Sequence, residues 1–222
     1  MRVMRCGLVL AFACGGIIAA TAQAPVVSGT QPPPPPPGQR GAQPPPPPGG
    51  RGGGRGRGAI QVMTLASSAF ADGAKMPAKY TQAGDEASPP LTWSGAPEGT
   101  ASFVLIVHDL DTAIAPGTDD MLHWMLWNIP PTTMSLPERV PLGAQLEDGT
   151  RQISATGPYY RGPGAAAAGP THHYMFELFA LDTMLDVPAV GASPPQTRAA
   201  IVSAMAGHVR AKAALAGLFK RE

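Results

Sequence analysis

The polar residues that could carry out chemistry gather around two apolar segments, residues 103–107 and 121–129. Asp109 and Asp111 follow the first segment, and His123 lies near the start of the second. Short apolar runs that contain branched and aromatic residues and end at turn formers are typical of buried strands. Two such strands would bring the two carboxylates and the imidazole together at strand ends, as a polar site in an apolar wall.

A third segment, His172–Leu181, has the pattern of a strand whose side chains point to opposite faces in turn. His172 and Tyr174 are two residues apart, so they point the same way. We expect both to line the same cavity as the three side chains above. His108 and His173 fall on the opposite faces of their strands, and we interpret them as structural.

This set of side chains is suited to a small anion. A phosphate needs hydrogen-bond donors, which imidazolium groups and a tyrosine hydroxyl provide. Neighbouring carboxylates keep histidines protonated and can accept hydrogen bonds from an ammonium group. A zwitterionic head group fits such a mixed site, and the side chains by themselves leave the ligand open. We expect a binding protein rather than an enzyme, with no cofactor.

Plainer roles stay open for each residue. Asp109 could begin a turn, His123 could be a core histidine paired with Asp109, and His172 and Tyr174 could be half-buried packing residues. Two Asp and two His also resemble a metal site, so a metal-dependent hydrolase is the alternative function. The sequence has neither an HExxH motif nor a G-x-S-x-G nucleophile elbow to support it. A third hypothesis is an interaction module that inhibits a hydrolase and binds a partner through a proline-rich segment.

The elements that must position these residues indicate a β-rich α+β domain, because strand-like segments come first and a helical pattern comes last. Two prolines at 194 and 195 suit a helix start, and three apolar residues follow at a spacing of four. We therefore predict that Pro194–Phe219 is helical, with a break at Gly207 that would divide it into two helices.

Residues 1–22 have the pattern of a secretory signal peptide, with two early arginines, an apolar run and small residues before the cut. The run is too short to span a membrane. We place the cut after Ala22, because Pro25 disfavours cleavage after Ala24. Both cysteines, Cys6 and Cys14, lie in this segment, so the mature chain would have no disulfide or thiolate site. We expect a periplasmic or secreted protein without stable membrane insertion.

Residues 23–58 are predicted to form a disordered linker. Within residues 25–58 there are 12 Pro and 10 Gly, and such runs stay extended or flexible. With so few apolar side chains, the segment cannot offset its ordering entropy. The remaining residues, 59–222, are enough for one domain and hold ten Lys and Arg against 15 Asp and Glu. This negative balance argues against nucleic acid as a partner.

Several ordered motifs across residues 60–222 resemble the phosphatidylethanolamine-binding protein (PEBP) family, in its bacterial YbhB/YbcL-like branch. They are SPPLTWSGAPEGTASFVLIVHDLD, HWMLWNIP, YRGPG, HHYMFELFALD and, at the C-terminus, GHVRAKAALAGLFKR. The resemblance implies a PEBP-like fold, in which a large antiparallel sheet packs on a smaller sheet, with C-terminal helices. It also implies a shallow pocket for small anions, phosphorylated head groups among them.

By the same resemblance, seven residues bind the ligand. They are Asp109, Asp111, His123, Gly162, Pro163, His172 and Tyr174. N–H groups of the Gly-Pro loop would then add donors for a phosphate. After this loop the sequence departs from the family, which often has more prolines there, so the rim on that side differs. Family members are also linked to kinase or protease inhibition. The sequence identifies no such partner and leaves a homodimer open.

We predict that residues 25–58 are dispensable for folding, because their composition offers no apolar surface to pack on the domain. A chain that starts at Ala59 should melt within a few degrees of the longer chain. Thermal unfolding of the two chains checks this. A midpoint many degrees lower for the shorter chain would show that the segment packs on the domain.

Overall fold

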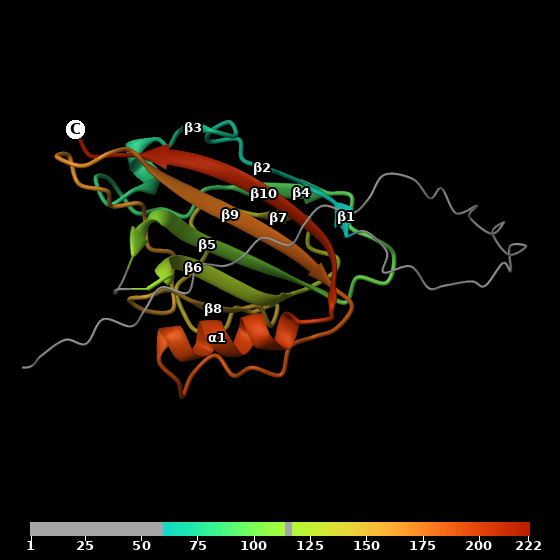
Figure 1. Cartoon of the computed structure of the whole chain (residues 1–222). Coiled ribbons are helices and arrows are strands. Elements are labelled where there is room, and N and C mark those ends of the chain that lie inside the picture. Colours follow the sequence, from blue (N-terminus) through green and yellow to red (C-terminus); the bar gives the residue numbers. More distant parts are fainter. Residues whose placement is uncertain (1–59, 114–116) are drawn as a thin grey trace, which may run out of the picture. The chain divides into compact units, whose positions relative to one another are not determined.

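The computed structural model describes residues 60–113 and 117–222. The predicted signal peptide, residues 1–22, and the predicted linker, residues 23–58, lie outside the described residues. The described part contains two β-sheets and one α-helix (Figure 1). The prediction of a β-rich α+β fold with a large and a small sheet is confirmed.

The larger sheet has the strand order β1-β10-β9-β5-β6-β8, with β3 beside the other end of β10. Its strands are β1 (Gln61–Val62), β3 (Ala74–Lys75), β5 (Ser102–Ala113), β6 (Asp120–Ile129), β8 (Arg151–Ile153), β9 (His172–Leu181) and β10 (Val209–Phe219). The smaller sheet, in the order β2-β4-β7, comprises β2 (Thr64–Ala66), β4 (Leu91–Ser94) and β7 (Ser135–Leu136). The helical segments are the 3-10 turn η1 (Ala78–Tyr80) and α1 (Pro194–Met205). Because β1 and β3 pair in parallel with β10, the larger sheet is mixed rather than purely antiparallel.

The three segments with the clearest strand patterns, β5, β6 and β9, form the centre of the larger sheet. Their apolar residues are buried on both faces, which explains the continuous apolar runs in β5 and β6. The pairing register places Asp109 of β5 opposite Met121 of β6 and Tyr174 of β9. Residues far apart in the sequence therefore meet at one end of these strands.

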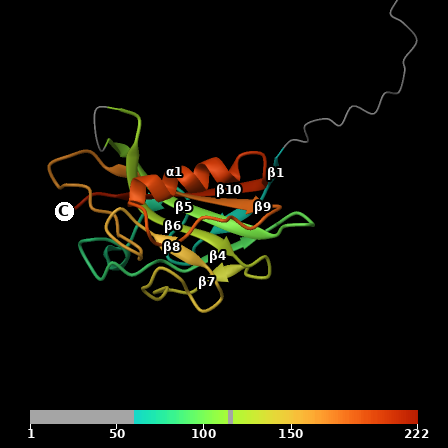
Figure 2. The same ribbon diagram turned by 90° about the horizontal axis from the view of Figure 1, so that it is seen from below.

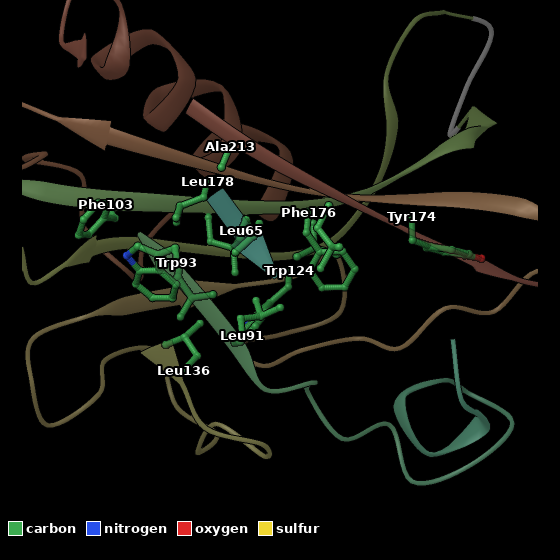
Figure 3. Close-up of a cluster of buried hydrophobic side chains, with 14 of the residues drawn as sticks. Leu65, Leu91, Trp93, Phe103, Trp124, Leu136, Tyr174, Phe176, Leu178 and Ala213 are labelled. Carbon is green, nitrogen blue, oxygen red and sulfur yellow. The ribbon is translucent and has the colours of Figure 1, made fainter. Parts of the chain in front are cut away.

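Each face of the larger sheet packs against its own apolar core. One core lies between the two sheets and includes Trp93 of β4 with Trp124 and Phe176 of the larger sheet (Figure 3). The other lies under α1, where Ile201 packs in a cluster with Trp127. Figure 2 shows α1 lying across the sheet. All three tryptophans are buried.

The prediction that Pro194–Phe219 is helical is wrong in its second half. The helix α1 ends at Met205, Gly207 has a φ of +84°, and Val209–Phe219 forms β10, which pairs with β9. Burial in β10 alternates residue by residue from Ala211 onward, as in a strand with one face on a core. Alanine favours helices, but cross-strand pairing and burial outweigh that local propensity. The described residues therefore contain one C-terminal helix, where the resemblance implied several.

On the α1 side of the sheet, His108 lies at the centre of a network of charges. Its Nδ1–H donates to Asp120 at 2.5 Å, and its Nε2–H donates to Glu177 at 3.2 Å. Arg198 of α1 lies 2.5 Å from Asp120, and Lys212 of β10 lies 2.5 Å from Glu177. Burial lowers the pKa of His108, but the hydrogen bonds and charges of Glu177 and Asp120 outweigh burial and raise it above its ordinary value. The network links α1 to four strands of the larger sheet, β5, β6, β9 and β10.

We expect the stabilising effect of His108 to be lost at alkaline pH. Its raised pKa in the folded state favours folding below the ordinary imidazole pKa of ~6.5, and this contribution disappears as the pH rises through the folded-state value. The substitution His108→Gln removes the charge, so it should lower the free energy of unfolding by about 1.5–3 kcal/mol at pH 6. The deficit should shrink as the pH rises to 9.

Urea unfolding at each pH measures this difference. His208→Gln is the control, because His208 pairs with Asp182 at the exposed surface and such pairs contribute little. A deficit for His108→Gln that does not change with pH would contradict the assignment of a cationic His108.

Candidate functional site

A pocket of about 220 Å³ lies beside Tyr174, which stands at one end of the inter-sheet cluster in Figure 3. Its walls come from β5, β6, β9 and the loop that follows residue 160. The lining residues are Gln82, Asp109, Thr112, Met121, His123, Arg161, Gly164, Ala165, Ala166, His172 and Tyr174. Four of the seven predicted site residues are among them: Asp109, His123, His172 and Tyr174.

The carboxylate of Asp109 is buried beneath this pocket and accepts three hydrogen bonds. The backbone N–H of Asp111 donates to Oδ1 at 2.9 Å, and the Thr112 hydroxyl donates to Oδ2 at 2.9 Å. The third donor is Nδ1–H of His172, at 2.8 Å from Oδ2. A buried carboxylate is expensive unless donors satisfy it. Asp109 therefore organises the floor of the pocket in addition to contributing charge.

His172 is oriented by this contact. Since a carboxylate can only accept, Nδ1 of His172 carries the proton that it shares with Asp109, and Nε2 is the ring nitrogen left for a ligand. The ring lies nearly parallel to that of Tyr174, with centroids 6.3 Å apart. Aspartate and histidine thus form a pair in which the aspartate fixes the tautomer, as carboxylates commonly do beside functional histidines.

His123 is oriented differently, because its Nδ1–H donates to the backbone carbonyl of Arg161 at 2.8 Å. Its ring packs edge-on against Tyr174, with centroids 5.0 Å apart. Burial lowers the pKa of His123 below its ordinary value, although the Arg161 carbonyl and the Asp109 charge oppose this. At neutral pH, Nε2 of His123 therefore carries a lone pair and acts as an acceptor. The expectation that both histidines are cationic donors does not hold for His123.

The hydroxyl of Tyr174 holds the loop that forms one wall. Its oxygen accepts the N–H groups of Gly164 at 3.2 Å and of Ala165 at 3.1 Å. Burial, with the charge of Asp109, raises the pKa of Tyr174 above its ordinary range, so the hydroxyl stays protonated. Tyr174 thus shapes the pocket through the loop.

Gly162 and Pro163 stand behind the pocket wall rather than in it. The N–H of Gly162 donates to Glu86, and the Gly162 and Pro163 carbonyls accept from Gln82 at 2.8 and 2.9 Å. The expectation that N–H groups of this loop are available to a phosphate is therefore not met at Gly162, Gly164 or Ala165, since each already has an acceptor within the protein. The loop approaches Thr81 so closely that a Cβ on Gly162 would lie 2.8 and 2.9 Å from two backbone carbons of Thr81.

Asp111 does not line the pocket with the other carboxylate, which corrects the prediction that all five side chains share one cavity. Its Oδ2 accepts the backbone N–H of His173 at 2.6 Å and Nδ1–H of His173 at 2.9 Å. The first of these bonds is the main reason that the pKa of Asp111 lies below its ordinary value. Asp111 reaches the site through its backbone N–H, which donates to Asp109.

The sequence analysis missed several lining residues, of which Arg161 and Gln82 matter most. Among the described residues that line this pocket, Arg161 is the one with a permanently cationic side chain. Its place directly before Gly162, inside the motif YRGPG, was the available signal. Gln82 had none, because it comes from an irregular segment some 80 positions away from its partner Gly162.

Two further properties concern metals and membranes. Within residues 60–113 and 117–222, no three His, Cys, Asp or Glu side chains gather in an arrangement that could hold a metal ion. In the same part of the chain, neither α1 nor η1 has the length and apolar character that a membrane crossing requires.

The chain is similar to several known proteins. A family model described as "Phosphatidylethanolamine-binding protein" matches residues 66–220. The "UPF0098 protein" of Methanothermobacter thermautotrophicus is 38% identical over 161 residues, which are 72% of this chain and 99% of that protein. The "Putative lipoprotein LppC" of Mycobacterium tuberculosis is 36% identical over 155 residues, 68% of this chain and 71% of that protein.

Two solved structures are similar as well. The crystal structure of CT736 from Chlamydia trachomatis, called a homologue of the same family, has a TM-score of 0.58 and 32% identity, and the match covers 73% of this chain and 99% of that one. YbcL from E. coli, called a new member of the mammalian PEBP family, has a TM-score of 0.57 and 27% identity, with coverage of 72% and 99%.

We predict that Gly162→Ala destabilises the protein by roughly 1–3 kcal/mol, because the added methyl group would overlap the Thr81 backbone, which cannot move aside cheaply. Gly169→Ala is the matched control, since its Cβ would meet nothing closer than 3.6 Å. Urea unfolding of both variants measures the effect. Equal stabilities would mean that the loop does not need the close approach at Gly162.

Proposed function

Because the chain belongs to the phosphatidylethanolamine-binding protein family, we propose that its pocket binds small anions, in particular phosphate and phosphoryl head groups. The observation that carries the proposal is the orientation of His172. Its Nδ1 is held by the buried Asp109, and its Nε2 is left for a ligand in a pocket that Arg161 also lines. A protonated His172 and a guanidinium together offer the donors that a phosphate requires.

The chemistry of the pocket favours a phosphate that still carries a proton or an ammonium group. His172 and Arg161 supply donors, whereas neutral His123 supplies an acceptor through Nε2. The monoanion of a phosphate monoester has both acceptor oxygens and one hydroxyl, and phosphoethanolamine also has an ammonium group as a donor. Either ligand satisfies donors and acceptors at once, which a fully ionised sulfate does not.

The size of the pocket supports a head group rather than a whole lipid as the bound portion. Pockets that enclose a drug-sized molecule measure about 300–1,000 Å³. The cavity between Asp109 and Arg161 measures about 220 Å³, which is too small for acyl chains. A phospholipid would therefore place only its phosphoryl group here.

We also propose that the protein is exported and acts in the periplasm or outside the cell. The support is the pattern of residues 1–22, with two early arginines and an apolar run before small residues. The similar protein from Mycobacterium tuberculosis carries the name of a lipoprotein. Inhibition of a kinase or protease, if it occurs, would then require an extracytoplasmic partner with a phosphorylated or acidic group for the pocket.

Binding of sulfate, whose charge is fixed over the working range, tests the role of His172. A cationic His172 would donate to the anion through Nε2–H. His172→Ala should therefore weaken binding at pH 5.5 by about 1.5–3 kcal/mol, or about 10- to 150-fold. Isothermal titration calorimetry measures the two affinities.

His173→Ala is the matched control, because that neighbouring histidine pairs with Asp111 outside the pocket. It should leave sulfate binding unchanged. His123→Ala should barely affect sulfate at pH 7, yet it should weaken phosphoethanolamine by about 2- to 10-fold through the loss of a neutral hydrogen bond. Equal affinity of the wild type and His172→Ala for both ligands would refute the proposed pocket. Hydrolysis of a phosphate monoester with stoichiometric bound metal would instead support the hydrolase.

A further inference from the structure

A second hollow, which we call the C-terminal groove, lies between β3, the start of η1 and the end of β10. It is lined by Lys75, Met76, Pro77, Ala78, Ala83, Phe219, Lys220, Arg221 and Glu222 and has a volume of about 640 Å³. Small-molecule sites typically measure about 300–1,000 Å³ and combine an apolar lining with a few polar groups. The C-terminal groove has a volume and a lining of this kind. It is separate from the pocket around Asp109, because the two have no lining residue in common.

The floor of the groove is apolar and rigid. Met76 and Phe219 are almost completely buried. The N–H of Met76 donates to the Leu218 carbonyl at 2.8 Å, so the two sides of the groove are joined by the sheet. Gly217 permits this packing, since a Cβ there would lie 2.5 Å from the Met76 sulfur. The apolar lining residues that remain exposed are Pro77, Ala78 and Ala83, and they offer a surface for a short hydrocarbon chain above this rigid support.

The rim of the groove is cationic. Its charged side chains are three cations, Lys75, Lys220 and Arg221, and one side-chain carboxylate, that of Glu222. This excess of cations contrasts with residues 59–222 as a whole, where Asp and Glu outnumber Lys and Arg. Glu222 lies 2.6 Å from Lys75, but both side chains are mostly exposed. Exposed pairs of this kind contribute little, so an incoming anion can displace Glu222 at small cost.

A wall separates the groove from the pocket. The backbone N–H of Arg221 donates to the Ala165 carbonyl at 3.1 Å, and Nη2 of Arg221 donates to Oε1 of Gln82 at 3.3 Å. Ala165 and Gln82 line the pocket, whereas Arg221 lines the groove. The two hollows are therefore neighbours with different linings. A ligand in the groove would not contact His123 or His172, which line the pocket.

We propose that the C-terminal groove is a second binding site, for amphipathic organic anions that carry a short alkyl chain. The chain packs on Pro77, Ala78 and Ala83, and the anionic group contacts Lys220 and Arg221. The guanidinium suits this role because it presents several donors to one oxyanion. The site goes beyond the proposed phosphate pocket and does not depend on it.

Calorimetry with n-octyl sulfate, below its micellar concentration, tests the second site on the full chain. The combined substitution Lys220→Gln and Arg221→Gln should weaken binding at least tenfold. Arg210→Gln is the control for the loss of a cation elsewhere on the same strand, because Arg210 pairs with Asp182 at the other end of β10. It should change the affinity less than twofold.

Two further arms locate the probe. His172→Ala weakens sulfate binding in the pocket, so octyl sulfate should still bind to this variant, and the double substitution should still weaken that binding at least tenfold. The uncharged n-octyl glucoside, which has the same chain, should bind at least tenfold more weakly than octyl sulfate. As a second variant that keeps the charges, Ala83→Leu should weaken binding by filling the groove. The proposal is overturned if the double substitution has no effect, if His172→Ala abolishes binding, or if the neutral detergent binds as well as the anion.

Discussion

The buried carboxylate of Asp109 is the group on which the pocket depends. It accepts hydrogen bonds from Asp111, Thr112 and His172, and it thereby joins β5 to β9. An ionised carboxylate at this depth is tolerated only because donors replace the water that it has lost. The same bonds decide which ring nitrogen of His172 pairs with the carboxylate. The local fold and the orientation of His172 therefore both depend on Asp109, and any change at Asp109 would affect both.

The rest of the fold supplies the rigidity that this arrangement needs. The central strands are covered on one face by the smaller sheet and on the other by α1, so their ends are fixed by two apolar cores. Polar groups are placed separately on the two sides. The pocket lies at the end of the inter-sheet core, whereas His108 and its partners lie under α1. This separation lets neighbouring residues of β5, His108 and Asp109, serve a structural network and a binding site independently.

The loop after residue 160 is shaped by internal hydrogen bonds rather than kept open for a ligand. Gly162 donates to Glu86, and Gly164 and Ala165 donate to Tyr174. Its backbone thus builds the wall, and the donors for an anion must come from side chains. That division explains why Arg161 has a larger role in the proposed function than the glycines of its motif. It also limits the pocket to small groups, while the larger apolar surface lies in the C-terminal groove.

The sequence by itself determined the β-rich class, the central strands and the common face of His172 and Tyr174. Strands buried on both faces have continuous apolar runs, and the side chains of a strand alternate between its faces, so both features can be recognised in a short stretch of sequence. It also carried the motifs that indicate the family. Only the tertiary structure decided that Val209–Phe219 is a strand. Its alanine-rich pattern is compatible with a helix, and the antiparallel pairing with β9 makes it a strand. Tertiary contacts likewise decided that Asp111 turns to His173 and that burial holds His123 neutral. Hydrogen-bond partners and desolvation depend on groups far away in the chain, and no local pattern encodes them.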